Sequence, residues 1–408
     1  MRARGLLMTL AGALAVAGCG GGTGLVHRTG TTSVQTVTVG VPSQAPQAVQ
    51  QLGFPSLATK NTTRVDGADP AADAAGVALA VYPSAAAGTH PFAVTLAPED
   101  DWPAAIAASV LMSAPIRAPV LLSGSIALPA ATAAALKLLA PAGSGSIGGA
   151  RVIRVGAVPP VGNAHAASIT GSDPYTLAAG IDRFVSAAAG RASPDVVVAS
   201  ATAPAYAMPA AGWAAESGDP VLYVNARGVP GATRQALQSH QHPHIYVLGP
   251  ASVIPDSVLA QLAHYGTVKR VGGADPAANA VAFAIYRDPA CPYGQPCAHV
   301  PGSFGWAMRS PGHGYTLLNA SRPLDAAASA ALSASGDYGP QLLLENASTL
   351  PRAVLNFFLD YATPGYTQEG PTAAVYNHGW VIGDQRQISV PVQAQIDNLL
   401  EAVPQSTR

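Results

Sequence analysis

Residues 64–70 read RVDGADP, residues 168–174 read SITGSDP and residues 270–276 read RVGGADP. The Asp-Pro pairs begin at positions 69, 173 and 275, at spacings of 104 and 102 residues. Three occurrences at nearly one spacing indicate an internal repeat. A period of this length is too long for a solenoid unit, so the sequence predicts three small domains in tandem.

Each copy of this motif has the residues of a strand, a sharp turn and a helix start. Short extended segments (63–65, 167–169 and 269–271) lead to a glycine that permits the turn. Asp69, Asp173 and Asp275 then stand where a carboxylate caps backbone N–H groups at a helix N-terminus. The proline that follows each of them fits the first helical position, where no N–H is needed. We therefore expect helices over 71–82, 175–188 and 277–286.

Further apolar runs recur between these helices. Residues 92–96 and 196–200 are predicted strands, and PVLLSG (119–124) aligns with PVLYVN (220–225), with 315–319 placed as their third equivalent. Each copy closes on a strand at 151–156, 245–249 or 380–383. Apolar strands that alternate with helices predict a parallel sheet covered on both faces. The expected fold is α/β, with three tandem Rossmann-like modules: the first at 61–162, the second at 163–267 and the third at 268–408, with an insertion at about 340–379.

The composition excludes two classes of protein. Apolar residues make up 49% and charged residues 11% of the chain, which excludes an intrinsically disordered protein. The formal net charge of −1 offers no basic footprint for nucleic acid, so no nucleic-acid partner is expected.

The start of the chain resembles the signal of bacterial lipoproteins. Arg2 and Arg4 precede a short apolar run at 6–16, and Val-Ala-Gly then leads to Cys19. The resemblance implies a signal peptide at 1–18, a lipid such as palmitate on Cys19, and anchoring at the extracytoplasmic face of the cell membrane. The alternative is an ordinary signal peptide with an incidental cysteine. Residues 19–60, rich in Gly, Ser, Thr and Pro, predict a flexible tether.

Cys291 and Cys297 are separated by five residues that include two prolines and a glycine. Outside the cytoplasm, a disulfide between them is the favoured prediction, and two free thiols are the alternative. Two cysteines beside one histidine, His299, make a poor zinc site.

The repeats resemble the cell wall-binding repeat 2 family of bacterial surface proteins. The resemblance rests on the Arg-x-x-Gly-x-Asp turn, the PVLL strand and the closing V-x-V-x-G strand, and it covers roughly 63–403. It implies modules packed around a pseudo-threefold axis and non-covalent, non-catalytic attachment to anionic cell-wall polymer or another envelope glycan. The chain departs from the family pattern where Pro follows each turn Asp and where Ser168 replaces the turn arginine.

Two groups of residues are candidates for polymer contact. Arg64 and Arg270 could face an anionic polymer, because a guanidinium matches phosphate and carboxylate geometry. Alternatively, they tie one module to the next. Tyr376, His378 and Trp380 concentrate aromatic groups that could stack on a sugar, together with Tyr361, Tyr366 and Asn377. Their alternative role is a satellite core under a long loop.

Motifs for catalysis, metals and cofactors are weak. GSGSIG at 143–148 follows a helix and precedes a strand, the reverse of the order that a dinucleotide site requires. His240, His242 and His244 are expected in an exposed loop, and no nucleophile elbow occurs. We therefore expect no cofactor, no metal and no catalytic residue. Two alternatives stay open: an enzyme acting on envelope glycan, with Asp360, Glu369 and Asp384 as its carboxylates, and a protein-binding scaffold.

Overall fold

The structure is a computed structural model that describes residues 57–86, 88–289, 291, 297, 303–336, 338–366 and 374–404. Cys19, the tether and Glu369 lie outside these residues. Within the described ranges, no helix has both the length and the apolar content that a membrane span requires.

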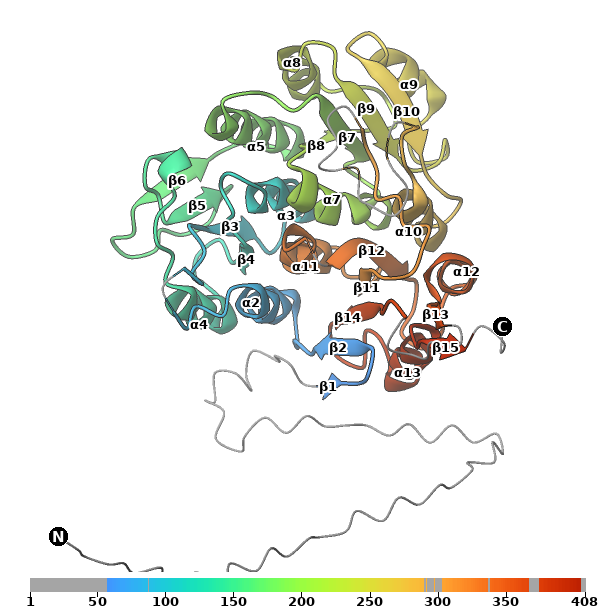
Figure 1. The fold of residues 1–408 in the computed structure, drawn as a ribbon. Coiled ribbons are helices and arrows are strands. Elements are labelled where there is room, and N and C mark those ends of the chain that lie inside the picture. The colour runs from blue at the N-terminus through green and yellow to red at the C-terminus, as the bar shows by residue number, and fades with distance from the viewer. Residues whose placement is uncertain are drawn as a thin grey trace, which may run out of the picture. The chain divides into compact units, whose positions relative to one another are not determined.

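Three sheets share one strand order, and their strands run parallel (Figure 1). The first sheet consists, in spatial order, of β4 (Val120–Ser123), β3 (Val94–Pro98), β5 (Val152–Val155) and β6 (Ala166–Ile169). The second consists of β8 (Val221–Val224), β7 (Asp195–Ser200), β9 (His244–Leu248) and β10 (Thr267–Val271). The third consists of β12 (Tyr338–Leu344), β11 (Gly314–Asn319), β14 (His378–Ile382) and β2 (Thr62–Val65), with β1 (Leu57–Ala58) antiparallel at its edge. A separate two-stranded pair joins β13 (Gly365–Tyr366) to β15 (Val403–Pro404).

The helices also recur in equivalent places, which confirms the α/β fold. The helices that follow the repeated motif are α2 (Pro70–Val81), α5 (Pro174–Ala189) and α10 (Pro276–Ile285). The helices that follow the central strands are α3 (Trp102–Ala108), continued by a 3₁₀ turn at Ser109–Met112; α6 (Pro204–Ala207) with α7 (Pro209–Ser217); and α11 (Leu324–Ala334). The others are α4 (Ala130–Leu139), α8 (Gly231–Ser239), α9 (Asp256–Leu262), α12 (Arg352–Phe357) with a π turn at Phe358–Ala362, α13 (Val390–Leu399) and a 3₁₀ turn at Gly145–Ile147.

The repeated motif builds the same turn three times. The carboxylates of Asp69, Asp173 and Asp275 accept hydrogen bonds from backbone N–H groups of Ala72, Thr176 and Ala278 at 2.9, 2.8 and 2.7 Å. The turn glycine is required because the helix passes very close to it. A Cβ on Gly67 would lie 2.4 Å from Oδ1 of Asp73, and a Cβ on Gly273 would lie 2.3 Å from the carbonyl carbon of Ala278.

The strand that opens each repeat pairs with a strand from elsewhere in the sequence. β6 and β10, which precede α5 and α10, pair with the closing strands β5 and β9 of the preceding repeat. β2, which precedes α2, pairs in parallel with β14 near the end of the chain. The first repeat therefore supplies the last strand of the third sheet, and the three modules close into a ring.

Equivalent helices meet at the centre of this ring. Helices α3, α7 and α11 contact one another pairwise, and Figure 1 shows them between the three sheets. Small residues permit this packing: a Cβ on Gly212 of α7 would lie 2.8 Å from Oγ of Ser333 on α11. The pseudo-threefold arrangement that the family resemblance implied is thereby confirmed.

The third module differs from its predicted alignment. In the sheet order, β11 takes the place of β3 and β7, not that of β4 and β8 as the sequence alignment had it. The equivalent of β4 and β8 is β12, which lies largely within the expected insertion at about 340–379. The prediction that residues 340–344 belong to an insertion was wrong. Both β11 and β12 are short apolar runs, and either of them fits the pattern of the repeated strand. The additional length lies in the connector at 286–313, between α10 and β11, and in the segment 358–377 before β14.

Candidate functional site

Arg64 is a structural residue of the ring closure. It is only 2% exposed. Its Nε donates to Oε1 of Gln393 at 2.8 Å, and its Nη1 and Nη2 donate to the carbonyl oxygens of Gly383 and Ile388 at 2.6 and 2.5 Å. Burial lowers the pKa of Arg64. The guanidinium thus ties β2 to the loop that follows β14.

Arg270 makes the same contacts in the second sheet. Its Nη1 donates to the carbonyl of Gly249 and its Nη2 to the carbonyl of Ile254, both at 2.7 Å. Gly249 and Gly383 are the equivalent glycines that end the closing strands β9 and β14. Nη2 also lies 2.8 Å from Oδ1 of Asp256, so Arg270, at the start of the third module, binds acceptors in the second. Both guanidinium groups thus bind the protein's own carbonyls and tie one module to the next, which is the alternative role given from the sequence, and contact of Arg64 and Arg270 with an anionic polymer stays a prediction.

Two of the predicted residues, His378 and Trp380, meet Tyr338, which the sequence did not single out, at the amino edge of the third sheet. Gly314 lies in register between Tyr338 on β12 and His378 on β14. Because Gly314 has no side chain, the two rings approach to 6.0 Å between centroids. The ring of Trp380, two residues further along β14, lies 5.6 Å from Tyr338 and 6.1 Å from His378. Each of the three side chains is partly exposed.

The polar groups of this cluster differ in whether they have a hydrogen-bond partner. Nε2 of His378 lies 3.0 Å from Oγ1 of Thr63. Burial lowers the pKa of His378 and also that of His313 nearby, so both rings are neutral at pH 7. The indole Nε1 of Trp380 is buried and has no hydrogen-bond partner among the described residues.

Tyr376 lies just before β14 and is 53% exposed. The segment that carries it is fixed by Asn377, whose Oδ1 accepts from the backbone N–H groups of Gly312 and His313 at 2.8 and 3.1 Å. The side-chain amide of Asn377 also donates to the carbonyl of Ala362. Tyr376 is thus presented at the same edge of the sheet as His378.

A hollow of about 210 Å³ opens beside the aromatic cluster. Its lining includes Trp306, His313 and Tyr338 together with Glu216 at the end of α7 in the second module. The hollow therefore lies at the junction of the second and third modules, and we call it the 2–3 hollow. It is many times larger than the roughly 15 Å³ that one bound water requires.

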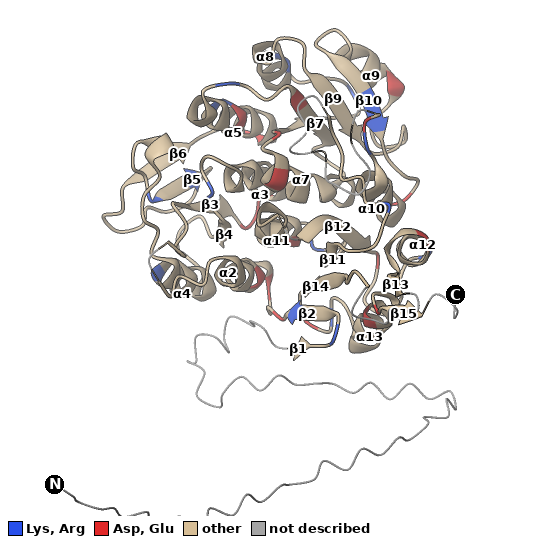
Figure 2. Ribbon diagram, viewed as in Figure 1, with Lys and Arg blue, Asp and Glu red and all other residues tan. Residues whose placement is uncertain are grey.

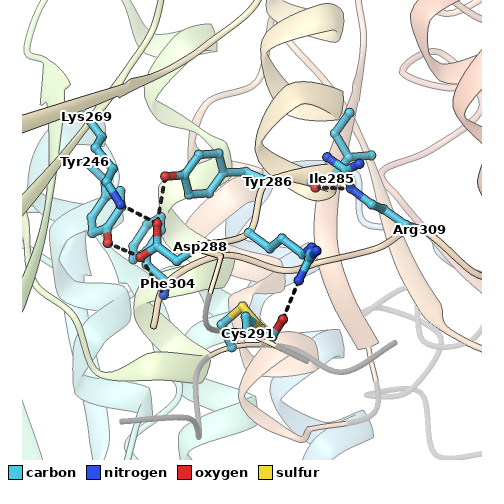
Figure 3. Close-up of a disulfide and its surroundings, with 10 residues drawn as sticks. Tyr246, Lys269, Ile285, Tyr286, Asp288, Cys291, Phe304 and Arg309 are labelled. Carbon is cyan, nitrogen blue, oxygen red and sulfur yellow. Dashed lines mark hydrogen bonds and ion pairs between the residues drawn. A yellow bond between two sulfur atoms is a disulfide. The ribbon is translucent and has the colours of Figure 1, made fainter. Parts of the chain in front are cut away.

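The connector at 286–313 supplies Trp306 and Met308 to this hollow and is firmly anchored (Figure 3). Asp288 accepts hydrogen bonds from Lys269, Tyr246 and Tyr286 at 2.6, 2.5 and 2.9 Å. Phe304 stacks on Tyr246 with ring centroids 3.6 Å apart. Cys291 and Cys297 form the disulfide that was favoured from the sequence.

The sequence did not predict this hollow, because its lining comes from separate segments of two modules. The available signal was the glycine content of 312–314 and 336–339. A Cβ on Gly339 would lie 3.0 Å from Cε of Met308, so a larger residue here would require the end of the Met308 side chain to move. Glycines at such spacing mark a close approach of chain segments, but they do not say which segments.

The described residues among those considered for catalysis or metal binding do not come together in one place. Asp360 precedes Ala362, which is bonded to Asn377 before β14, whereas Asp384 follows β14 at the opposite edge of the sheet. Glu369 lies outside the described residues. His240 is buried against Asp182, and His244 pairs with Asp195. Among the described residues, no group of three or more His, Cys, Asp or Glu side chains could hold a metal ion.

Comparison with known proteins identifies the second module. Residues 168–259 match the family described as Cell wall binding domain 2 (CWB2). The second module is therefore similar to a CWB2 domain. The family resemblance drawn from the repeated turn is thus confirmed, and the first and third modules share the CWB2 strand order by their sheet topology.

Two solved structures share the arrangement of this chain. Cwp6 from Clostridium difficile superposes with a TM-score of 0.64 at 16% identity, covering 84% of this chain and 48% of that one. Cwp8 from Clostridium difficile gives 0.61 at 15%, covering 84% and 52%. The likeness concerns the fold, and this chain spans about half the length of either protein. No curated protein sequence matches it significantly.

Proposed function

We propose that the chain is a non-catalytic protein of the cell envelope that binds cell-wall polymer through its CWB2 modules. The CWB2 match in the second module supports this proposal. The contact surface that we propose is the 2–3 hollow with the aromatic cluster beside it. The observation that carries the assignment is the approach of Tyr338, His378 and Trp380 over Gly314, since partly exposed rings beside a hollow are suited to stacking on sugar.

We further propose that Cys19 carries a lipid that anchors the protein at the extracytoplasmic face of the cell membrane. Residues 20–60 would then hold the modules away from the membrane, toward the wall. Replacing Cys19 with Ser should release the protein from the membrane fraction. Retention of the Cys19→Ser variant in that fraction would exclude lipid anchoring through this residue.

Binding to insoluble wall material tests the proposed contact surface. The mature protein should sediment with wall fractions from its own host. Tyr338→Ala should lower its affinity about tenfold, as for a central aromatic contact. Tyr338→Phe retains the ring and should bind like the parent protein. Failure of the parent protein to sediment with any wall fraction would exclude wall binding, and equal binding by Tyr338→Ala would exclude this surface.

A further inference from the structure

A second hollow lies at the junction of the first and second modules. Its volume is about 100 Å³, and we call it the 1–2 hollow. Its lining includes Ser113 and Ala114 at the end of the 3₁₀ turn that continues α3. The remaining lining comes from the second module: the end of α5, residues 191–194 before β7, and residues 217, 218 and 220 between α7 and β8.

The two hollows occupy equivalent positions in the repeat. In the 2–3 hollow, Glu216 at the end of α7 takes the place of Ser113 at the end of the first module's central helix. Residues 312–314 before β11 take the place of 191–194, and residues 333, 336, 338 and 339 take the place of 217, 218 and 220. Both hollows thus open at the amino edge of a sheet, where one module meets the next.

Helix C-termini converge on both hollows. The 3₁₀ turn ends at Met112, α5 at Ala189 and α7 at Ser217 around the first hollow, and α7 and α11 end beside the second. The last carbonyl groups of a helix lack the N–H partners of a next turn and carry the negative end of its dipole, and here some of them accept from protein groups, as Val110 does from Ser113 and Trp213 from Ser217. Such an edge accepts hydrogen bonds from hydroxyl groups and repels anions.

The side chains that line the hollows also offer hydrogen-bond acceptors to a ligand. The hydroxyl groups of Ser113, Ser193 and Ser217 already donate to protein acceptors at 2.8, 2.6 and 2.8 Å, so toward a ligand their oxygens can only accept. Glu216 places a carboxylate at the 2–3 hollow. The one cationic side chain among the described lining residues is Arg191, at the 1–2 hollow.

The rest of the charge distribution offers no basic surface. Figure 2 shows Lys and Arg spread over all three modules. Arg64 and Arg270, the arginines of the repeated motif, are bonded to carbonyl groups of the protein. A polyanion would therefore meet few free cations at either hollow.

We propose that the 1–2 and 2–3 hollows are paired subsites for one uncharged, hydroxyl-rich glycan. The hydroxyl groups of the sugar donate to the acceptors at the helix ends, and the aromatic cluster of the third module stacks on a sugar face. Two subsites on one rigid ring bind one strand more tightly than either alone, because the second contact is intramolecular. This inference rests on the proposed wall binding and specifies its ligand.

The test uses the mature chain and two kinds of wall. Affinity is measured for insoluble wall before and after removal of its phosphate- and carboxylate-bearing accessory polymers, at about 50 and about 500 mM NaCl. Soluble N-acetylglucosamine oligomer and poly(glycerol phosphate) serve as neutral and anionic competitors. We expect binding to survive both stripping and salt, and to be displaced by the neutral oligomer alone.

Two variants locate the binding. Ala189→Trp fills the 1–2 hollow from an exposed position and should lower affinity at least about fivefold. Ala187→Trp, exposed on the same helix outside the lining, should bind like the parent protein.

Two results would overturn the inference: loss of binding at high salt or after stripping, and equal affinity of the two tryptophan variants. In each case the parent protein still binds intact wall, so the proposed function stands. Failure to bind any wall preparation would instead remove the proposed function itself.

Discussion

Arg154 on β5 lies directly across from Ser168 on β6 in the register of the first sheet. In the other two sheets, the equivalent pairs are Val247 with Arg270 and Val381 with Arg64. In the first sheet, the repeated motif has Ser168 in place of the arginine, and an arginine stands instead at the facing position of the neighbouring strand. Nε and Nη2 of Arg154 donate to the carbonyl of Val158, at 3.2 and 2.6 Å, in the loop after the closing strand.

Because either strand can supply this arginine, we expect an arginine at position 168 to compensate for the loss of stability when Arg154 is replaced. Arg154→Val should lower the free energy of unfolding by about 1 kcal/mol, because the loop carbonyl loses its donor. Adding Ser168→Arg recreates the arrangement of the other sheets and should restore at least half of the loss. Urea denaturation of the single and double variants measures this. If the effects of the two substitutions simply add without recovery, the two positions are not equivalent in this role.

A second prediction concerns the carboxylates at the ring closure. Asp73 of α2 and Asp325 of α11 are fully buried, and Arg322 lies 2.6 Å from Oδ2 of Asp73 and 2.8 Å from Oδ2 of Asp325. Burial raises the pKa of Asp325 to about 7 despite the attraction of Arg322. Burial, together with repulsion from Asp325, raises the pKa of Asp73 well above its usual value.

A carboxyl group with a raised pKa binds its proton more tightly in the folded state. Stability should therefore fall as pH rises from about 4, the value in the unfolded chain, to about 7. Asp325→Asn should make the unfolding free energy less dependent on pH in this range, whereas Asn at the exposed Asp100 should not change that dependence. Denaturation at several pH values checks this, and an unchanged slope in Asp325→Asn would contradict it.

A third prediction concerns His240, which contacts a residue in the lining of the 1–2 hollow. Its Nδ1 lies 2.7 Å from the carbonyl of Ser193, a residue of the lining, and its Nε2 lies 2.9 Å from Oδ2 of Asp182. Both ring nitrogens face acceptors, and this arrangement favours the imidazolium form, which can donate from both. Burial lowers the pKa of His240, but the hydrogen bond and charge of Asp182 outweigh it and raise the pKa overall.

The stabilisation from this pair should be complete below about pH 6.5 and should be lost as pH rises through the raised value. His240→Gln leaves Asp182 buried without its counter-charge and should cost on the order of 3 kcal/mol at acidic pH, and less at alkaline pH. His242→Gln, exposed in the same loop, is the matched control. A cost that does not change with pH would show that the ion pair is not the cause.

These arrangements mark the limit of what could be predicted from the sequence. The caps at Asp69, Asp173 and Asp275 depend on residues within three positions, so their spacing was sufficient. The residues next to Arg64 in the sequence do not reveal whether its side chain is buried or exposed. Its burial depends on Gly383 and Ile388, more than 300 positions away, and on β2 crossing to the third sheet. The 2–3 hollow likewise requires Glu216 and Tyr338 to meet across a module junction.

The connector of the third module yields the last prediction. It is held in two ways: by the disulfide between Cys291 and Cys297, and by Asp288, which also accepts from the backbone N–H of Phe304 at 3.2 Å. The disulfide closes a loop of only a few residues, so its removal in a Cys291→Ser/Cys297→Ser variant should cost about 2 kcal/mol. Asp288→Ala should cost more, since it leaves the buried hydroxyl of Tyr246 without its acceptor.

The two variants should also separate stability from wall binding. Trp306 and Met308 lie beyond Phe304, whose position depends on Asp288 and on stacking against Tyr246. Asp288→Ala should therefore change the fluorescence of Trp306 and weaken wall binding under conditions in which the protein stays folded. The double serine variant should retain both properties, because Asp288 still fixes the end of the connector that enters the hollow. If the double serine variant loses wall binding as strongly as Asp288→Ala, the disulfide itself shapes the 2–3 hollow.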